Sequence, residues 1–134
     1  GTKDSVANIA ETGVFCVNTV EQAAREAMNA TSGPWPREVD EFDHAQIARA
    51  PCETIACSRV ADAPAALECR LTQIVTLPGE ANRLVLGEVV GIHLRDDCLR
   101  EGRFDVTAFH PLARCGYRDY AVVREVFELK RPGE

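Results

Sequence analysis

The first residues of the chain are of types that could bind an anion. Lys3, Asp4 and Ser5 lead into a run with apolar residues at helical spacing, and Gly13 is placed to end that helix. Asp4 or Ser5 suits the N-cap position, because a short side-chain oxygen can accept hydrogen bonds from the free amides of the first turn. These amides and the helix dipole favour a phosphate, to which Lys3 would add a positive charge and Ser5 a hydroxyl donor. From the spacing alone, a capped surface helix with an incidental lysine is the more ordinary interpretation.

No other short motif in the sequence marks a catalytic centre. There is no P-loop, no Ser-His-Asp order and no G-x-G-x-x-G, so a Rossmann-type nicotinamide site is not expected. The acidic run from Asp40 to His44 holds carboxylates and one histidine, but such a loop is more often solvated than metal-binding. We therefore expect no metal site.

Length and composition predict a single globular domain over residues 1–134. The sequence is 46% hydrophobic and 27% charged, which are ordinary values for a folded domain of this size. The net charge of −6 argues against a nucleic acid or an anionic membrane as the main partner. In addition, no apolar run approaches the roughly 18 residues of a membrane-spanning helix.

Six cysteines allow either reduced thiols or a disulfide framework. The closest pair, Cys52 and Cys57, lacks C-x-x-C spacing, and Cys16 and Cys69 lie in apolar runs. A free cysteine in such a run behaves as a small buried hydrophobic residue. We expect reduced thiols and a cytoplasmic protein; the alternative is a set of disulfides in an exported protein.

The hydrophobic pattern predicts an α+β, mainly β layout with few strands. A short strand is expected over residues 14–18 and a helix over 20–28, begun by a capping box of Thr19 and Gln22. The glycine and two prolines of ATSGPWPREVDEF mark a loop, after which a short helix could form from Ala45 to Ala50.

The second half of the chain has the pattern of a long β-hairpin. Residues 65–77 and 83–94 are expected to be its strands, around a turn at 78–82. Gly87 and Gly91 within it indicate bulges or a close backbone approach. A helix or turn is expected near 106–112 and a last strand over 120–129. Such a sheet has edges to hide and resembles part of a barrel.

Several segments resemble flavin reductase-like proteins with the FMN-binding split β-barrel (Greek-key) fold. KDSVANIAETGVFCVN is similar to the KDT-x-x-N-I-x-x-T-G-x-F-V-V-N segment of that family, with Ser5 in place of threonine. The likeness continues, in order, through NATSGPWPREVDEFD, PAALECRLTQIV, LVLGEVVGIHL and HPLARCGYRDYAVVREVFELKRP. Family members usually carry several strands before the KDT segment. The resemblance therefore implies a split barrel with flanking helices that is incomplete in this chain, with edges that need a partner.

The resemblance also implies roles for individual residues. The start of the first helix would be the FMN phosphate cradle, made by Lys3, Asp4, Ser5 and Asn8. Arg114 and Tyr117 occupy a segment where the family often has R-x-G-G-x-x-Y lining the flavin pocket, although Tyr117 replaces the second glycine. Tyr117 could stack on the flavin or pack in the core. His93 is placed where relatives have a histidine near the flavin and nicotinamide; otherwise it is a polar surface residue.

On these grounds we expect an FMN-binding flavin oxidoreductase. It would pass a hydride from NAD(P)H to flavin and then to a second flavin or a small acceptor, and it would work as a homodimer. Two alternatives stay open: a flavin-binding protein without turnover, and a truncated split-barrel dimer that binds no flavin.

Overall fold

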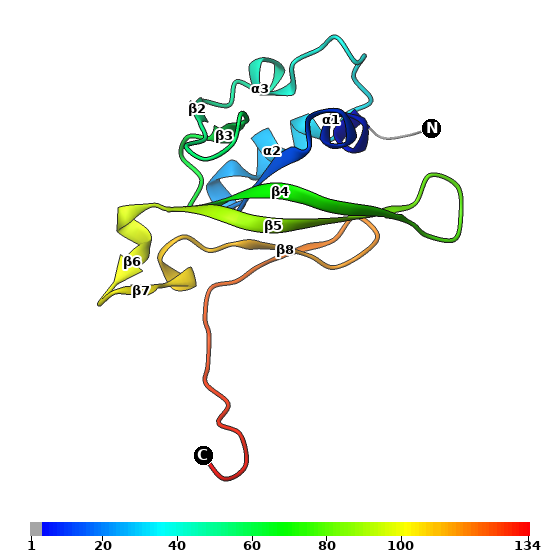
Figure 1. Cartoon of the computed structure of the whole chain (residues 1–134). Helices are drawn as coiled ribbons and strands as arrows, with labels where there is room; N and C mark the ends of the chain where they lie inside the picture. The colour runs from blue at the N-terminus through cyan, green and yellow to red at the C-terminus, as the bar shows by residue number, and fades with distance from the viewer. Residues whose placement is uncertain (1–3) are drawn as a thin grey trace.

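A three-stranded antiparallel sheet lies at the centre of the molecule. The computed structural model describes residues 4–134, and Figure 1 shows the mixed α+β arrangement around this sheet. Its strands are β1 (Val14–Asn18), β4 (Ala65–Thr76) and β5 (Arg83–Leu94), in the order β1-β4-β5. Within residues 4–134 the strands do not close into a barrel, since the others form three separate two-stranded pairs.

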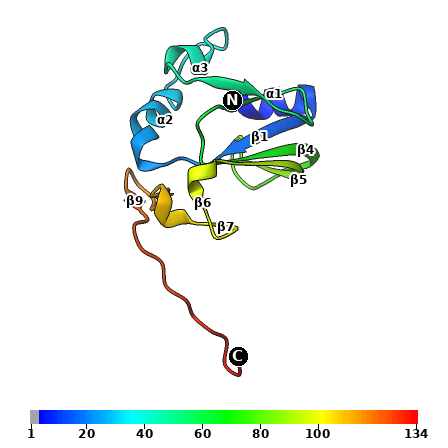
Figure 2. The ribbon, with the colours of Figure 1, turned by 90° about the vertical axis from the view of Figure 1, so that its left-hand side faces the viewer.

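Smaller elements lie on both sides of this sheet, as Figures 1 and 2 show from two directions. One side carries α1 (Asp4–Thr12), α2 (Arg25–Thr31), α3 (Glu41–His44), β2 (Arg49–Pro51) and β3 (Ser58–Val60). The other side carries β6 (Leu99–Arg100), β7 (Arg103–Phe104), β8 (Leu112–Arg114) and β9 (Tyr120–Val122). Short 3-10 turns cover Gln22–Ala24, Asp96–Cys98 and Val106–Ala108. None of the helices between residues 4 and 134 is long and apolar enough to cross a membrane.

The first helix and strand are confirmed as predicted. Gly13 ends α1 with a positive φ of 73°, a conformation that glycine adopts without a Cβ penalty. Its amide donates to the Ile9 carbonyl at 2.8 Å, and its own carbonyl accepts from the Leu71 amide at 2.9 Å. The end of α1 is therefore tied directly to β4. Asp4 and Ser5 both lie inside the helix, so the N-cap position falls outside the described residues.

The predicted capping box of Thr19 and Gln22 is wrong. Residues 22–24 form a 3-10 turn before α2. No side-chain hydrogen bond caps the start of this turn or the start of α2. The reason is a tertiary contact: the Gln22 amide donates to the His110 carbonyl at 3.0 Å, and Glu21 pairs with Pro111 as an isolated β-bridge. This pairing keeps the chain extended up to Glu21 and delays the helix.

The helix expected from Ala45 to Ala50 is also wrong. The helix forms earlier, as α3, where the Asp40 carboxylate caps the Phe42 amide at 2.9 Å. Gln46 then takes a left-handed φ of 56°, which ends the helical path, and Arg49 enters β2 opposite Val60. Strand pairing decided this segment over local helix propensity.

The β4–β5 hairpin is confirmed, with register shifts at Glu68/Cys69 and Leu71/Gln73. Its two glycines sit at close approaches. A Cβ on Gly87 would lie 2.5 Å from Cζ of Phe15 and 3.1 Å from the Arg70 carbonyl oxygen. A Cβ on Gly91 would lie 3.1 Å from Oγ1 of Thr54. Gly87 thus needs the small residue, and Gly91 marks a close approach to Thr54 and Glu68, as the sequence indicated.

The last strand ends earlier than predicted. Only Tyr120–Val122 pairs with β8, and the Val123 amide makes the last bond of this ladder, to the Pro111 carbonyl at 2.9 Å. Beyond it the chain runs extended, away from the body of the molecule (Figures 1 and 2). The predicted strand stops because, within the described chain, no neighbouring strand is there to pair with it.

Replacing Gly87 with alanine tests the contact with Phe15. An alanine usually stabilises a strand relative to glycine, but here its methyl group would overlap the Phe15 ring. We expect Gly87→Ala to lower the free energy of unfolding by about 1–3 kcal/mol. The measurement is the urea midpoint followed by circular dichroism, with Glu88→Ala on the same strand as the control. A midpoint that rises in Gly87→Ala would contradict the close packing.

Candidate functional site

The start of α1 presents three of the predicted cofactor contacts on one exposed surface. Asp4, Ser5 and Asn8 are solvent-exposed residues of its first two turns, and Lys3 lies outside the described residues. The helix has nine residues, and the amides of its first turn have no partner within a helix. This end therefore retains donors and positive potential that suit an anion.

A cation that the sequence did not suggest lies beside this helix. Nη2 of Arg37 donates to Oδ1 of Asn8 at 3.2 Å, and its guanidinium lies 3.8 Å from the Asp4 carboxylate and 3.7 Å from that of Glu11. Arg37 comes from the loop between α2 and α3, so only the fold places it here. It offsets the negative charge of Asp4, which would otherwise oppose an anion at the helix start.

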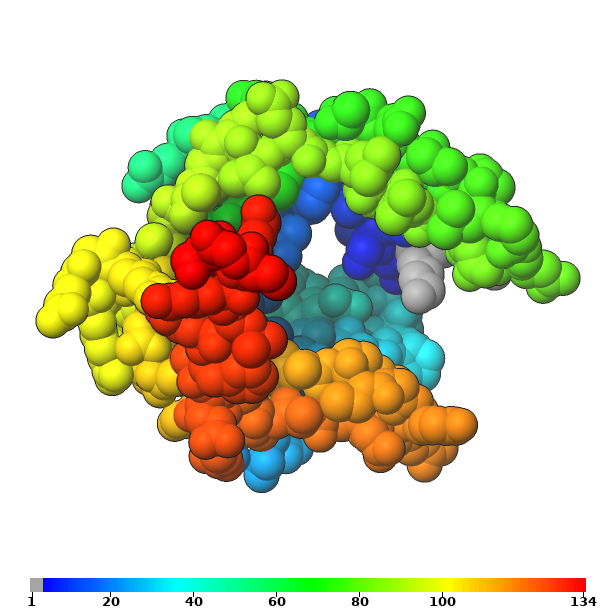
Figure 3. All heavy atoms as spheres, turned by 90° about the horizontal axis from the view of Figure 1, so that it is seen from below, coloured from blue at the N-terminus to red at the C-terminus, as the bar shows by residue number. Residues whose placement is uncertain are grey.

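A hollow opens through the middle of the face that Figure 3 shows. It is bordered by the β4–β5 hairpin in green, by the early part of the chain in blue and by residues of the β8–β9 hairpin in orange. The beginning of the described chain and the β8–β9 hairpin thus border one space, although no hydrogen bond or ion pair joins α1 to β8 or β9 in residues 4–134.

The β8–β9 hairpin displays Arg114 and Tyr117 to solvent. Tyr117 is 94% exposed and has a left-handed φ of 47°, so the alternative of a core position is wrong. The Arg114 guanidinium donates to the Tyr117 carbonyl and lies 4.9 Å from the centre of the Tyr120 ring. The hairpin is held by Arg114, and the aromatic ring of Tyr117 is left free.

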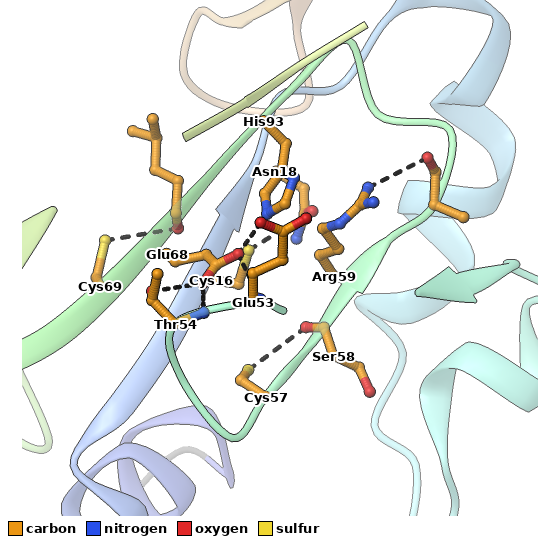
Figure 4. Close-up of polar contacts among 12 residues, drawn as sticks. Cys16, Asn18, Glu53, Thr54, Cys57, Ser58, Arg59, Glu68, Cys69 and His93 are labelled. Carbon is orange, nitrogen blue, oxygen red and sulfur yellow. Dashed lines mark hydrogen bonds and ion pairs between the residues drawn. The ribbon is translucent and has the colours of Figure 1, made fainter. Parts of the chain in front are cut away.

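His93 is placed on the other side of the sheet from this hairpin, against a buried carboxylate. Figure 4 shows its ring directed at Glu68, and Nε2 contacts Glu68 Oε2. Glu68 is fully buried, and it also accepts from the Thr54 amide at 2.7 Å, the Thr54 hydroxyl at 2.6 Å and the Glu53 amide at 3.0 Å. These donors, the Thr54 hydroxyl first, lower the pKa of Glu68 from 4.5 to about 2.

The structure thus does not bring all the predicted residues together. Asp4, Ser5 and Asn8 form one group and Arg114 and Tyr117 another, while one ring nitrogen of His93 is already engaged by Glu68. A contact of His93 with flavin or nicotinamide stays a prediction. Sequence reasoning missed Glu68, although a lone carboxylate inside the apolar run AALEC is itself a signal of a buried, partnered charge.

The thiols near this pair are not activated. Burial raises the pKa of Cys16 to about 12, with further contributions from nearby Cys52, and burial also raises the pKa of Cys52. A thiol of raised pKa stays protonated at neutral pH and is a poor nucleophile. All six cysteines are unpaired in the structure.

Two carboxylates of the acidic run from Asp40 to His44 form ion pairs with a neighbouring arginine. Nη2 of Arg49 lies 2.7 Å from Oδ2 of Asp40 and 3.3 Å from Oδ1 of Asp43, and its guanidinium lies over the Phe42 ring at 4.7 Å. Among residues 4–134, no three histidine, cysteine or acidic side chains are arranged to hold a metal ion. In this fold the acidic run holds Arg49 and caps α3.

Comparison with known proteins decides the family. The flavin reductase like domain model matches residues 2–115, which is most of the chain. The chain belongs to the flavin reductase-like family. The resemblance carried by the KDS segment is thereby confirmed, and α1, the β4–β5 hairpin and β8 of this chain all lie within the matched range.

Several solved structures share the fold of this chain. The structure of nitrilotriacetate monooxygenase component B from Bacillus cereus is 28% identical, with a TM-score of 0.87 over 95% of this chain and 65% of that one. A 2-nitrobenzoate 2-nitroreductase from Pseudomonas fluorescens is 29% identical, with a TM-score of 0.85 over 97% of this chain and 65% of that one. A flavin reductase-type structure with a split barrel domain, from Shewanella frigidimarina, shares the fold at a TM-score of 0.85 and 20% identity, over 97% of this chain and 68% of that one. The split-barrel fold class is confirmed, in the form of a barrel that stays open within residues 4–134.

Among curated sequences, an uncharacterised protein of Deinococcus radiodurans is 38% identical over 96% of this chain. Another, from Halalkalibacterium halodurans, is 30% identical over 97% of it. The chain spans 58% and 64% of the lengths of these two relatives, respectively.

The low pKa of Glu68 predicts how stability depends on acidity. Because its folded pKa, about 2, lies below the ordinary value of 4.5, ionised Glu68 contributes stability above about pH 4.5. That contribution is lost as the pH falls from about 4.5 through about 2. We expect Glu68→Gln to be less stable than the native chain at neutral pH, and its stability to change less over this acid range.

The measurement is the urea midpoint at neutral pH and at several acid values, with the exposed Glu88→Gln on β5 as the matched control. Equal pH profiles for the native chain and Glu68→Gln would sink the assignment of a low pKa to this carboxyl.

Proposed function

We propose that this chain is the flavin-binding part of an FMN-dependent oxidoreductase. In it, a hydride from NAD(P)H would be received by the flavin and passed to a second flavin or a small acceptor. The proposal rests chiefly on one observation: within a flavin reductase-like domain, the start of α1 carries the exposed Ser5 and has the Arg37 guanidinium 3.8 Å from its Asp4 carboxylate.

The residues at the start of α1 fit a phosphomonoester. The Ser5 hydroxyl and the first-turn amides would donate to its oxygens, and Lys3 and Arg37 would balance its charge. Asn8 would serve as an orienting residue, since its Oδ1 already accepts from Arg37. Asp4 is compatible with an anion because Arg37 lies beside its carboxylate.

The β8–β9 hairpin supplies what a planar ring would need on the other side of the hollow. The exposed ring of Tyr117 can stack on a flat aromatic group, and Arg114 fixes the hairpin by bonding the Tyr117 carbonyl. In this arrangement the helix start anchors the phosphate and the hairpin limits access to one face of the ring.

When bound, FMN would supply the redox chemistry, so the protein needs few acid or base side chains. Its own residues would bind the phosphate, orient the ring and keep water from one face. The absence of a catalytic motif in the sequence is consistent with this division of work.

We further propose that the protein works as a homodimer in the cytoplasm, with NAD(P)H as the reductant. Six unpaired cysteines support a reducing compartment. The likeness to a 2-nitrobenzoate 2-nitroreductase, at 29% identity, supports a redox role. Structures of a flavoredoxin, an NADH:FAD oxidoreductase and an FMN-binding protein share the fold at lower identity.

Titrating the purified chain with FMN tests the proposal directly. Quenching of flavin fluorescence reports binding, and anaerobic addition of NADH or NADPH, followed by loss of the visible flavin bands, reports hydride transfer. Binding with bleaching supports the oxidoreductase, whereas binding without bleaching favours a carrier or sensor. No binding would leave a flavin-free split-barrel protein and overturn the proposal.

Arg37 gives a sharper test of the phosphate anchor. Loss of a charge-assisted contact of about 1.5–3 kcal/mol should weaken FMN binding about tenfold to hundredfold in Arg37→Gln. Riboflavin lacks the phosphate, so its affinity should not change. Arg103→Gln, an exposed arginine in β7, is the control. Equal losses for FMN and riboflavin would show that Arg37 acts on folding rather than on the phosphate.

A further inference from the structure

Two cysteines face each other across the base of the loop between β2 and β3. The ladder of these strands pairs Pro51 with Ser58, and the Cys52 amide continues it by donating to the Cys57 carbonyl at 2.9 Å. Directly opposed residues of an antiparallel ladder present their side chains on the same face. An opposed pair joined by a backbone hydrogen bond has Cα atoms about 5.5 Å apart, which is within the range of about 4.4–6.8 Å for disulfides.

The two thiols are neighbours and can be reached from solvent. Cys52 and Cys57 are both partly exposed, and Sγ of Cys57 donates to the Ser58 carbonyl at 3.4 Å. Burial is the main cause that raises the pKa of Cys52, and the nearby Glu68 and Cys57 add to it. The side chains of Cys52 and Cys57 therefore interact already in the reduced protein.

The loop that this pair closes is the one that compensates the buried Glu68. The Glu53 and Thr54 amides donate to the Glu68 carboxylate at 3.0 and 2.7 Å. Figure 4 shows these two residues and Cys57 on the same stretch of chain beside Glu68. Ile55, between them, is only 7% exposed, so the loop is packed on the sheet. A covalent link across its base would hold both amides on the carboxylate.

We propose that Cys52 and Cys57 are an oxidative modification site, at which hydrogen peroxide converts the two thiols into a reversible disulfide that holds the loop on Glu68. The Cys57 sulfur first attacks the peroxide, whose O–O bond breaks; a sulfenic acid forms and one water is released. The Cys52 sulfur then attacks the Cys57 sulfur, so that the S–S bond forms and a second water leaves. The two thiols lose two electrons and two protons, and the peroxide is reduced to two waters.

The order of the two steps follows from the surroundings of the thiols. The raised pKa of Cys52 keeps its thiol protonated at neutral pH, which makes it the poorer group for the first attack on peroxide. In the second step its partner is held directly opposite by the ladder, and this proximity compensates for the small thiolate fraction. A dithiol such as dithiothreitol restores both thiols by exchange.

Cys16 is the rival partner for Cys52. It lies on β1 opposite Glu68, and its contact with Cys52 contributes, after burial, to raising its pKa to about 12. No ladder sets Cys16 opposite Cys52, whereas the Cys52–Cys57 pair is aligned by its own backbone bond. The pairing within the loop is therefore favoured over a link to the sheet.

The inference is independent of the proposed flavin function, because it is read on the thiols with no flavin added. The test is a tryptic map of the native chain, treated with hydrogen peroxide at neutral pH and then alkylated. Residues 50–59 form one tryptic peptide, since Arg49 and Arg59 bound it and no other lysine or arginine lies within it. We expect this peptide to be about 2 Da lighter and free of alkyl groups, and dithiothreitol to reverse both changes.

Two variants separate the possible pairings. Cys16→Ser should keep the loss of mass in peptide 50–59, and Cys57→Ser should abolish it; circular dichroism verifies that each variant is folded. A link from Cys16 would instead join peptide 50–59 to peptide 4–25. That cross-linked product, or a peptide 50–59 that stays fully alkylated after peroxide, would overturn the proposal.

Amide hydrogen exchange tests the effect on the loop. Exchange at the Glu53 and Thr54 amides requires the loop to leave Glu68, so we expect it to be severalfold slower in the oxidised chain than in the reduced one. The amides of the β4–β5 turn, residues 78–82, serve as the internal control and should exchange at the same rate in both. Equal exchange of the loop amides in both forms would show that the disulfide does not hold the loop.

Discussion

A carboxylate that is fully removed from solvent must be compensated by hydrogen-bond donors, and the helix side of this fold is organised around one such group. Glu68 lies in the middle of the central strand β4 and accepts two amides, one hydroxyl and a contact from His93. Its donors come from the loop between β2 and β3 and from β5, so the carboxylate holds that loop on the sheet. On the opposite side of the sheet the cover is thinner, and Val17 and Ile92 stay largely accessible. Hydrogen bonds to one buried carboxylate therefore organise one side, whereas the other side exposes apolar side chains.

The candidate flavin site lies at the margin of this sheet and not on it. The helix start is held by the bond between Gly13 and Leu71, and Arg37 is brought to it by a loop that crosses from α2 to α3. The hairpin with Arg114 and Tyr117 is positioned by its own ladder and by the neighbouring bridge that joins residues 21 and 111. Rigid elements thus supply the anchor, and loops supply the groups that would meet a ligand.

Local patterns were sufficient for much of this fold. Apolar residues at helical spacing before Gly13 predicted α1, a short apolar run predicted β1, and alternating apolar residues predicted the β4–β5 hairpin. These elements depend on residues that are close in sequence. The KDS segment and its companions likewise indicated the flavin reductase-like family, since their order along the chain is itself the signal.

Contacts between distant residues decided the rest. The start of α2 was shifted by pairing with residues near 110, β2 replaced an expected helix because β3 was available, and the last strand stopped at Val122 for lack of a neighbour. Arg37 and Asn8 are 29 residues apart, and Glu68 and His93 are 25 apart. The sequence alone determined most of the elements and the family to which they belong. Only the tertiary structure decided which charges meet, because a charge is placed by the packing of whole elements and not by its neighbours in the chain.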